Sequence, residues 1–128
     1  MILMDTDVCV EILRGNNHVL NRYGKENDSA AISFDTVDEL YYGVFRSNRI
    51  EQNLLLVERF LLTVPVIQSD SEIMKKFREL KASLSGNIIP DADILIAATA
   101  LCKCKKLISG NIAHFRRFEN LSIENWMK

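Results

Sequence analysis

Ile2-Leu3-Met4-Asp5-Thr6-Asp7 places an apolar run directly before two acids and a hydroxyl. The apolar run predicts a short buried strand, and the segment from Val8 to Arg14 has the spacing of a helix that ends at Gly15. An acid at the end of a buried strand lies at the edge of the core, where a carboxylate needs a partner. This stretch therefore predicts the first unit of an α/β fold and its first functional candidate, Asp5.

The alternation of strand and helix continues along the chain. Further strands are expected at 30–33, 64–67, 106–108 and 121–123, and Pro65 favours an edge position or a strand start for the third strand in the sequence. Apolar residues recur at helical spacing over 37–45, 50–61 and 73–84, and the apolar stretch 92–103 predicts a central buried helix. The pattern predicts a single domain over 1–128, with a three-layer α/β/α fold around a central, mainly parallel sheet.

Composition limits the class of protein. The chain has 128 residues, of which 48% are apolar and 26% charged, and its net charge of -1 excludes a protein that binds nucleic acid mainly through overall charge. No apolar run approaches the roughly 20 residues that a membrane-spanning helix needs, and no basic region precedes the first apolar stretch as in a secretory signal. Three cysteines without a pairing framework favour a reducing environment, so we expect a cytoplasmic protein that does not bind membranes.

Acids at the edges of apolar runs are the main functional signal. Besides Asp5, Glu39 precedes Leu40-Tyr41-Tyr42, and Asp91 and Asp93 precede the apolar helix. In open parallel sheets, sites lie beyond the carboxyl ends of the strands, where Asp5 and Ser109 both fall. Converging carboxylates repel each other and need a cation or shared protons, and oxygen ligands are what Mg²⁺ and Mn²⁺ prefer. The arrangement points to metal-assisted phosphodiester chemistry.

Helix capping is an alternative role for Asp7, Glu39 and Asp91. Asp7 fits a cap of the first helix, and Thr36 to Glu39 matches a capping box with Thr36 as the N-cap. Of the pair before the apolar helix, Asp91 is the more natural cap, which leaves Asp93 further inside and in need of a metal or a basic partner.

The last strand is followed by Ser109-Gly110-Asn111 and then His114. A turn is the simplest interpretation of the triplet, although its side-chain oxygens are also candidates for holding water beside a metal. A histidine on a helix surface is commoner than a catalytic one. The basic residues of the C-terminal third are most simply a solvated face: Lys103, Lys105, Lys106, Arg116 and Arg117.

Taken in order, these segments resemble the motifs of PIN-domain ribonucleases. Met4 to Asp7 resembles the family's Leu-Asp-Thr-Asn signature, and Ser33 to Leu40 resembles its Ser-x-x-Thr-x-x-Glu-Leu segment. Asp93 to Ala98 resembles its Asp-x-x-Ile-Ala-Ala helix, and Leu107 to Phe115, followed by Trp126, resembles its closing block. The small size and this ending are similar to the VapC-type toxins of bacterial toxin–antitoxin pairs.

The resemblance implies a Mg²⁺- or Mn²⁺-dependent endoribonuclease, usually a homodimer, that is inhibited by a cognate antitoxin. It implies that Asp5, Glu39 and Asp93 are the catalytic acids, that Asp5 and Asp93 bind the metal, and that structured RNA such as tRNA is a candidate substrate. Further candidate metal ligands are Glu39, Asp91 and Asn111, with supporting roles for Thr6, Asp7 and Ser109. The chain departs from the family at Asp7, where Asn is usual, and at Asn111, where many members have Asp.

Two other functions fit parts of the pattern. An aspartate-nucleophile phosphatase would use Asp5 for attack and Asp7 for proton transfer, but its order of motifs differs and leaves Glu39 without a role. A degenerate PIN-like module that only binds RNA or protein would explain Asp7 and Asn111. Stabilisation by a divalent ion distinguishes a working acid cluster from a degenerate one.

Overall fold

A single parallel sheet forms the centre of the computed structural model, which describes residues 1–84, 86 and 88–128. Its strands follow the order β3-β2-β1-β4-β5, and every neighbouring pair is parallel. The bounds are β1 (Ile2–Met4), β2 (Ala30–Ser33), β3 (Val66–Ile67), β4 (Leu107–Ile108) and β5 (Ile123–Glu124). The predicted parallel sheet is confirmed, and Pro65 lies just before the edge strand β3, as expected.

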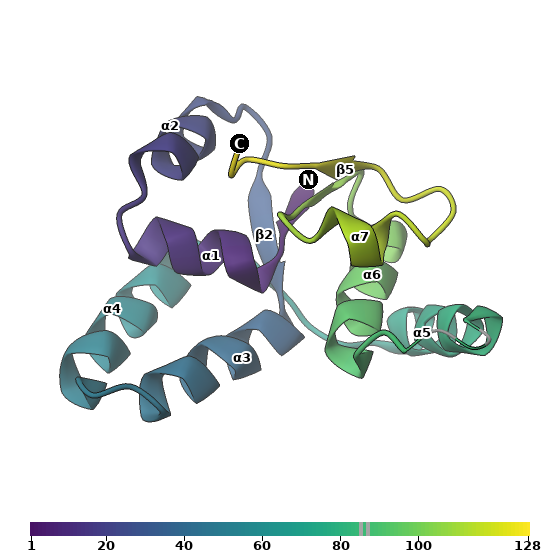
Figure 1. The fold of residues 1–128 in the computed structure, drawn as a ribbon, viewed down its shortest axis with the longest axis horizontal. Helices are drawn as coiled ribbons and strands as arrows, with labels where there is room; N and C mark the ends of the chain where they lie inside the picture. The colour runs from purple at the N-terminus through teal and green to yellow at the C-terminus, as the bar shows by residue number, and fades with distance from the viewer. Residues whose placement is uncertain (85, 87) are drawn as a thin grey trace.

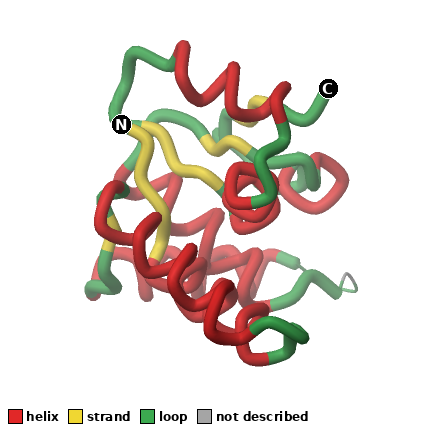
Figure 2. Tube along the Cα trace, turned by 90° about the vertical axis from the view of Figure 1, so that its left-hand side faces the viewer, coloured by secondary structure: helices red, strands yellow, loops and turns green. Residues whose placement is uncertain are grey.

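Helices cover both faces of the sheet (Figures 1 and 2). Successive side chains of a strand point to opposite faces, so Ile2 and Met4 pack into one hydrophobic cluster and Leu3 into the other. The first cluster involves α1 (Thr6–Leu13), α2 (Asn17–Lys25), α3 (Phe34–Phe45) and α4 (Ile50–Thr63). The second involves α5 (Ser71–Ser83), α6 (Asp91–Lys103) and α7 (Ile112–Phe115). These two covered faces confirm the three-layer α/β/α fold.

Helix α6 is the most buried helix, as its sequence predicts. Its buried residues include Ala97, Ala98 and Ala100, whose small side chains allow close packing against the sheet and α5. The helix has 13 residues. Neither α6 nor any other helix in the described residues is both long and apolar enough to cross a membrane.

Two helices were not expected from the spacing of apolar residues. Helix α2 buries only Val19 and begins where the Asn16 side chain accepts hydrogen bonds from the backbone N–H groups of His18 and Val19. Helix α7 is a single turn of four residues, too short to show a period. Both begin for local reasons, and an apolar stripe is therefore a poor guide to them.

Candidate active site

Asp5 lies where the two central strands end. It follows β1, and Ser109 follows the neighbouring strand β4, so the Ser109 hydroxyl donates a 2.7 Å hydrogen bond to Asp5 Oδ2. The other oxygen, Oδ1, accepts the Thr6 backbone N–H at 2.8 Å, which makes Asp5 the N-cap of α1. The prediction that Asp7 caps this helix is therefore wrong, because β1 leads into the helix two residues earlier. Asp5 is only 5% exposed.

Asp7 turns from α1 toward the loop after β4. Its Oδ2 accepts the Gly110 backbone N–H at 3.0 Å, whereas its Oδ1 is buried without a hydrogen-bond partner in the described part of the chain. Burial raises the pKa of Asp7, and the Gly110 hydrogen bond opposes that rise. A Cβ atom at Gly110 would lie 3.0 Å from Asp7 Oδ2 and 2.8 Å from Met127 Cε, so a larger residue here would have to displace Met127 and press on the Asp7 carboxylate.

Glu39 is directed across the site instead of back along its own helix. Because β2 ends at Ser33, α3 begins at Phe34, and Ser33 is the N-cap that accepts the Thr36 backbone N–H at 3.2 Å. The predicted capping box with Thr36 as N-cap is therefore wrong. Glu39 Oε1 accepts a 2.8 Å hydrogen bond from the Thr6 hydroxyl, which joins α3 to α1 and gives Thr6 a supporting contact.

Asp93 and Asp91 have different surroundings at the start of α6. The N-cap is Pro90, and Asp91 is exposed and paired with Lys81 of α5 at 3.0 Å, so the prediction that Asp91 caps the helix is wrong. Asp93 is 18% exposed, and its Oδ2 lies 2.7 Å from His114 Nδ1. The sequence predicted that Asp93 needs a metal or a basic partner. The structure places His114 of α7 there, a residue that the sequence analysis interpreted as an ordinary surface histidine.

Asp35 is a site residue that the sequence analysis missed. It lies one turn before Glu39 on α3, and its Oδ2 is buried without a hydrogen-bond partner among the described residues. Burial raises the pKa of Asp35 to about 7, with further contributions from Glu39, Asp38 and Asp93. The signal that would have found Asp35 is its position four residues before Glu39, which places both acids on one helix face.

The site therefore gathers five acids, Asp5, Asp7, Asp35, Glu39 and Asp93, from the N-terminal turns of α1, α3 and α6 (Figure 1). Burial raises the pKa of Asp5 to about 7, and the charge of Asp7 adds to this effect. Within 1–84, 86 and 88–128, no lysine or arginine forms an ion pair with any of the five. Positive helix ends offset only part of this charge.

A divalent cation suits this donor set. The partnerless Asp7 Oδ1 and the raised pKa of Asp5 indicate a negative site that lacks a counter-charge. The acids do not form a ready-made cage, because no group of three His, Cys, Asp or Glu side chains in the described residues is arranged to hold a metal. Mg²⁺ keeps several of its waters and usually takes one or two carboxylates, so a site built on few protein ligands fits this ion.

The phosphatase alternative does not fit the geometry at Asp5. A nucleophilic carboxylate needs an accessible oxygen, but Asp5 is 5% exposed and both of its oxygens accept hydrogen bonds, from Thr6 and Ser109. The acid is placed to bind and orient, not to attack.

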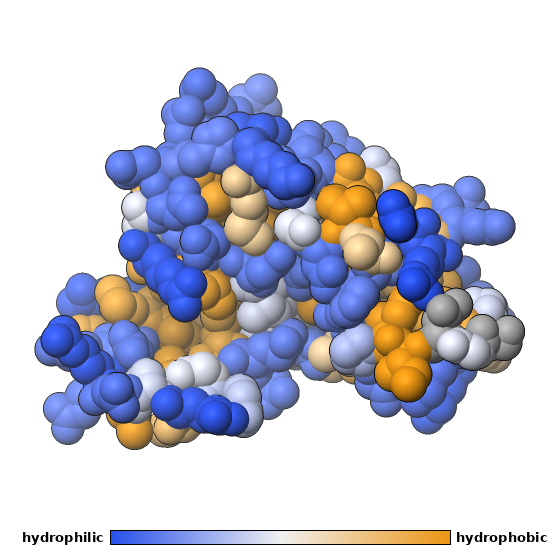
Figure 3. Space-filling model, viewed as in Figure 1, coloured by the Kyte–Doolittle hydropathy of each residue, from blue (hydrophilic) through white to orange (hydrophobic). Residues whose placement is uncertain are grey.

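An apolar groove adjoins the acids. A cavity of about 360 Å³ runs between α1, α3 and α4, and Figure 3 shows apolar atoms gathered over the space between α3 and α4. Its charged members are Glu39 and Arg14, and its apolar lining includes Val10, Leu13, Val44, Leu56 and Val57. Of the stripe expected on α4, Val57 lines the groove, Leu54 and Leu61 are half-buried against the core, and Ile50 is exposed.

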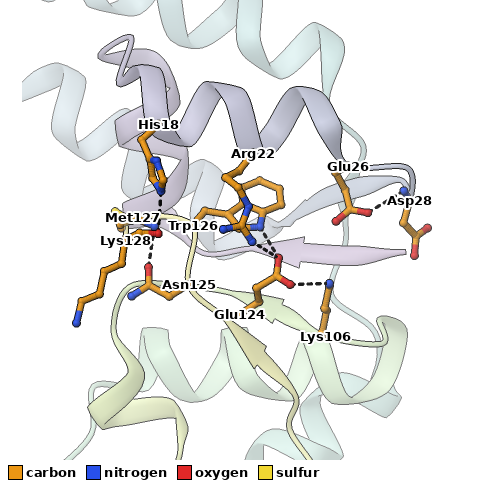
Figure 4. A network of polar contacts seen from close by, with 10 residues as sticks. All are labelled: His18, Arg22, Glu26, Asp28, Lys106, Glu124, Asn125, Trp126, Met127 and Lys128. Atoms are coloured by element: carbon orange, nitrogen blue, oxygen red, sulfur yellow. Dashed lines mark hydrogen bonds and ion pairs between the residues drawn. The ribbon is translucent and has the colours of Figure 1, made fainter.

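The C-terminal segment runs beside α2 and is held there by a network of polar contacts (Figure 4). Lys106 and Arg22 both pair with Glu124, at 3.1 and 3.3 Å, and the Trp126 indole donates to the same carboxylate. Beyond this network, Met127 reaches Gly110. Lys103 and Lys105 are likewise paired, with acids that include Asp70 and Asp28, so these lysines do not form a free basic face.

Three comparisons with known proteins agree with this architecture. The model of the PIN domain family matches residues 2–121. The chain is 34% identical to ribonuclease VapC2 of Rickettsia felis, with 98% of each chain covered, and 27% identical to the tRNA(fMet)-specific endonuclease VapC of Salmonella typhimurium, with 97% of this chain and 96% of the relative covered. Its fold matches the crystal structure of VapBC2 from Rickettsia felis bound to a DNA fragment from their promoter, with a TM-score of 0.90, 33% identity, and 98% and 99% of the two chains covered.

Proposed function

Since this chain belongs to the PIN-domain family, we propose that it is a metal-dependent endoribonuclease that acts as the toxin of a toxin–antitoxin pair. The observation that supports this most strongly is the cluster of five acids without a lysine or arginine partner in the described residues. A cluster of this kind is costly unless a cation joins it, and a divalent cation is what phosphodiester cleavage uses.

Asp5 and Asp93 are the proposed ligands of Mg²⁺ or Mn²⁺, with Glu39 and Asp7 next to them. Asp5 offers rigid oxygens because Thr6 and Ser109 fix its carboxylate. Asp93 has one oxygen against His114. A bound divalent cation supplies Lewis acidity, which activates water toward the phosphodiester and offsets the charge that builds on the phosphate.

The chain's own residues orient the other participants. Glu39 is half-buried and fixed by the Thr6 hydroxyl through Oε1, so its second oxygen is the proposed acceptor for the attacking water. Asn111 lies in the fourth position of the family's pattern, but its amide lies against His114, at 2.9 Å from Nδ1. We therefore assign Asn111 to positioning the loop after β4 and not to direct metal binding.

RNA is the proposed substrate, and tRNA is the first class to test, because one relative is named as a tRNA(fMet)-specific endonuclease. Several lysines of the C-terminal third are already used in ion pairs, including Lys103, Lys105 and Lys106. Attraction of the RNA to this protein is therefore expected to be local to the site, which suits recognition of an accessible single-stranded loop. Such a nuclease acts in the cytoplasm, where its RNA is found.

An antitoxin is the proposed occupant of the groove between α1, α3 and α4. Glu39 belongs to both the groove and the acid cluster, so an apolar partner helix in the groove can bring a basic side chain to the acids. Arginine is the expected residue, since its fork matches carboxylates. Exposed apolar residues on α4, such as Leu55 and Leu62, favour a homodimer in addition.

The decisive experiment compares matched variants on RNA. Purified protein should cleave RNA in Mg²⁺ or Mn²⁺ and stop in EDTA, and Glu39→Gln should reduce cleavage at least 100-fold. Asp38→Asn is the control, because Asp38 is the exposed neighbour of Glu39 on the same helix and should keep activity. Full activity in Glu39→Gln or in EDTA contradicts the proposal. Co-expression with a small antitoxin-like protein, sought in the neighbouring reading frame, should remove toxicity, and a chain that is harmless alone contradicts the toxin role.

A further inference from the structure

Three acids of the cluster accept a hydrogen bond from a neutral donor elsewhere in the chain. Asp5 accepts from Ser109, Asp7 from the Gly110 backbone, and Glu39 from Thr6, at 2.7, 3.0 and 2.8 Å. Among the described residues, Asp7 and Glu39 are held in this way through one oxygen each, which leaves the other oxygen for a cation, whereas both oxygens of Asp5 accept hydrogen bonds. The donors are therefore part of the site, although they need not touch the metal.

Asp93 follows the same rule with a different donor. His114 Nδ1 lies 2.7 Å from Asp93 Oδ2, and the contact engages that oxygen alone. The ring comes from α7, whose next residue, Phe115, is fully buried in the core with Phe118. Asn111 Nδ2 lies 2.9 Å from the same nitrogen, but Nδ1 cannot donate to Asp93 and accept from Asn111 at once. Because an ionised carboxylate only accepts, the contact with Asp93 requires the tautomer that carries its hydrogen on Nδ1.

We infer that His114 is the positioning residue of Asp93, which donates Nδ1–H to Oδ2 and leaves Oδ1 to bind the divalent cation. The inference rests on the proposed metal-dependent function. Carboxylate partners of this kind contribute to metal affinity without being ligands, and their loss typically weakens binding by about 10- to 100-fold. His114 is 38% exposed, so its replacement disturbs little packing.

Two substitutions separate the two ring nitrogens. Asparagine places its amide nitrogen near the position of Nδ1, whereas glutamine places it near the position of Nε2. If the donated hydrogen at Nδ1 is what matters, His114→Asn should bind the metal like the wild type. His114→Gln and His114→Ala should both lose affinity.

The measurement is the binding of Mn²⁺ to the full chain at pH 7.5, from the electron paramagnetic resonance signal of free Mn²⁺. We expect wild type and His114→Asn to agree within about threefold, and His114→Gln and His114→Ala to bind about 10- to 100-fold more weakly. The other histidine of the chain provides the control: His18 contacts the Lys128 carbonyl at 2.8 Å, and His18→Ala should bind like the wild type. Circular dichroism in EDTA confirms that each variant is folded.

The remaining outcomes overturn the inference in distinguishable ways. Equal affinity in all four proteins means that His114 does not position a ligand. Weak binding by His114→Asn as well means that the ring itself, and not its Nδ1 hydrogen, is required. If the wild type binds no Mn²⁺, the metal requirement under the proposed function fails together with this inference.

Discussion

Replacing Asp5 with Asn in metal-free protein tests the electrostatic account of the site. Asparagine keeps the shape of the side chain and removes its charge. Its amide oxygen can still accept the Thr6 backbone N–H, and its amide nitrogen can donate to the Ser109 hydroxyl, which now acts as acceptor. The substitution should therefore remove repulsion and keep both contacts, although the hydroxyl hydrogen of Ser109 loses its acceptor.

The expected gain follows from the pKa of Asp5, which burial raises from 3.8 to about 7. A shift of this size, at about 1.4 kcal/mol per pKa unit, makes the ionised carboxylate cost up to roughly 4 kcal/mol in the fold. The folded chain binds this proton more tightly than the unfolded chain, so the penalty from ionised Asp5 is absent at low pH and grows as the pH rises from about 4 through about 7. Asp5→Asn should recover about 2–4 kcal/mol at pH 8, about 1–2 kcal/mol at pH 5 and almost nothing below about pH 4.

Thermal unfolding in EDTA, followed by circular dichroism at pH 5 and pH 8, measures this directly. The melting temperature of Asp5→Asn should exceed that of the wild type by on the order of 10 °C at pH 8. The same variant should not cleave RNA in Mg²⁺ or Mn²⁺. An equal gain at both pH values, or a loss at pH 8, would refute the reasoning, because neither follows from a buried charge that titrates near neutrality.

Three further substitutions test single contacts of the site. Asp91→Ala removes an exposed ion pair and should change the free energy of unfolding by less than about 0.5 kcal/mol in a denaturant titration, with RNA cleavage retained. Gly110→Ala should destabilise the fold and lower cleavage, since the new Cβ would lie 3.0 Å from the Asp7 carboxylate; a variant with wild-type melting and activity would contradict the close approach. Thr6→Val keeps the shape of the side chain but removes its hydrogen bond to Glu39, so the cleavage rate should fall at least tenfold while circular dichroism stays unchanged.

The sequence was a good guide to the strands and to α6. The short apolar runs before Asp5 and Ser33 predict strands, because parallel strands that are buried on both faces are apolar along most of their length. The stretch 92–103 was equally clear, since a helix that is apolar on most sides must be buried. Helix starts were less predictable, because a cap depends on where the preceding strand ends, as at Asp5 and Ser33.

The site was predicted in its main acids but not in its contacts. Asp5, Glu39 and Asp93 were recognisable from their positions beside apolar runs and from the family resemblance, and their roles in catalysis stay predictions. His114 was set aside because a histidine on a helix surface is commoner than a catalytic one. Helix α7 has only four residues, and nothing in the sequence indicates that this single turn lies against α6. Asp35 was not predicted because it occupies a variable position of the Ser-x-x-Thr-x-x-Glu-Leu segment.

The hydrogen bonds that organise the acids join residues far apart in the chain. Ser109 is 104 residues from Asp5, and Gly110 is 103 residues from Asp7. During synthesis the N-terminal acids leave the ribosome long before the segment that orients them. An incomplete nascent chain therefore holds Asp5 and Asp7 without these two donors until Ser109 and Gly110 have emerged.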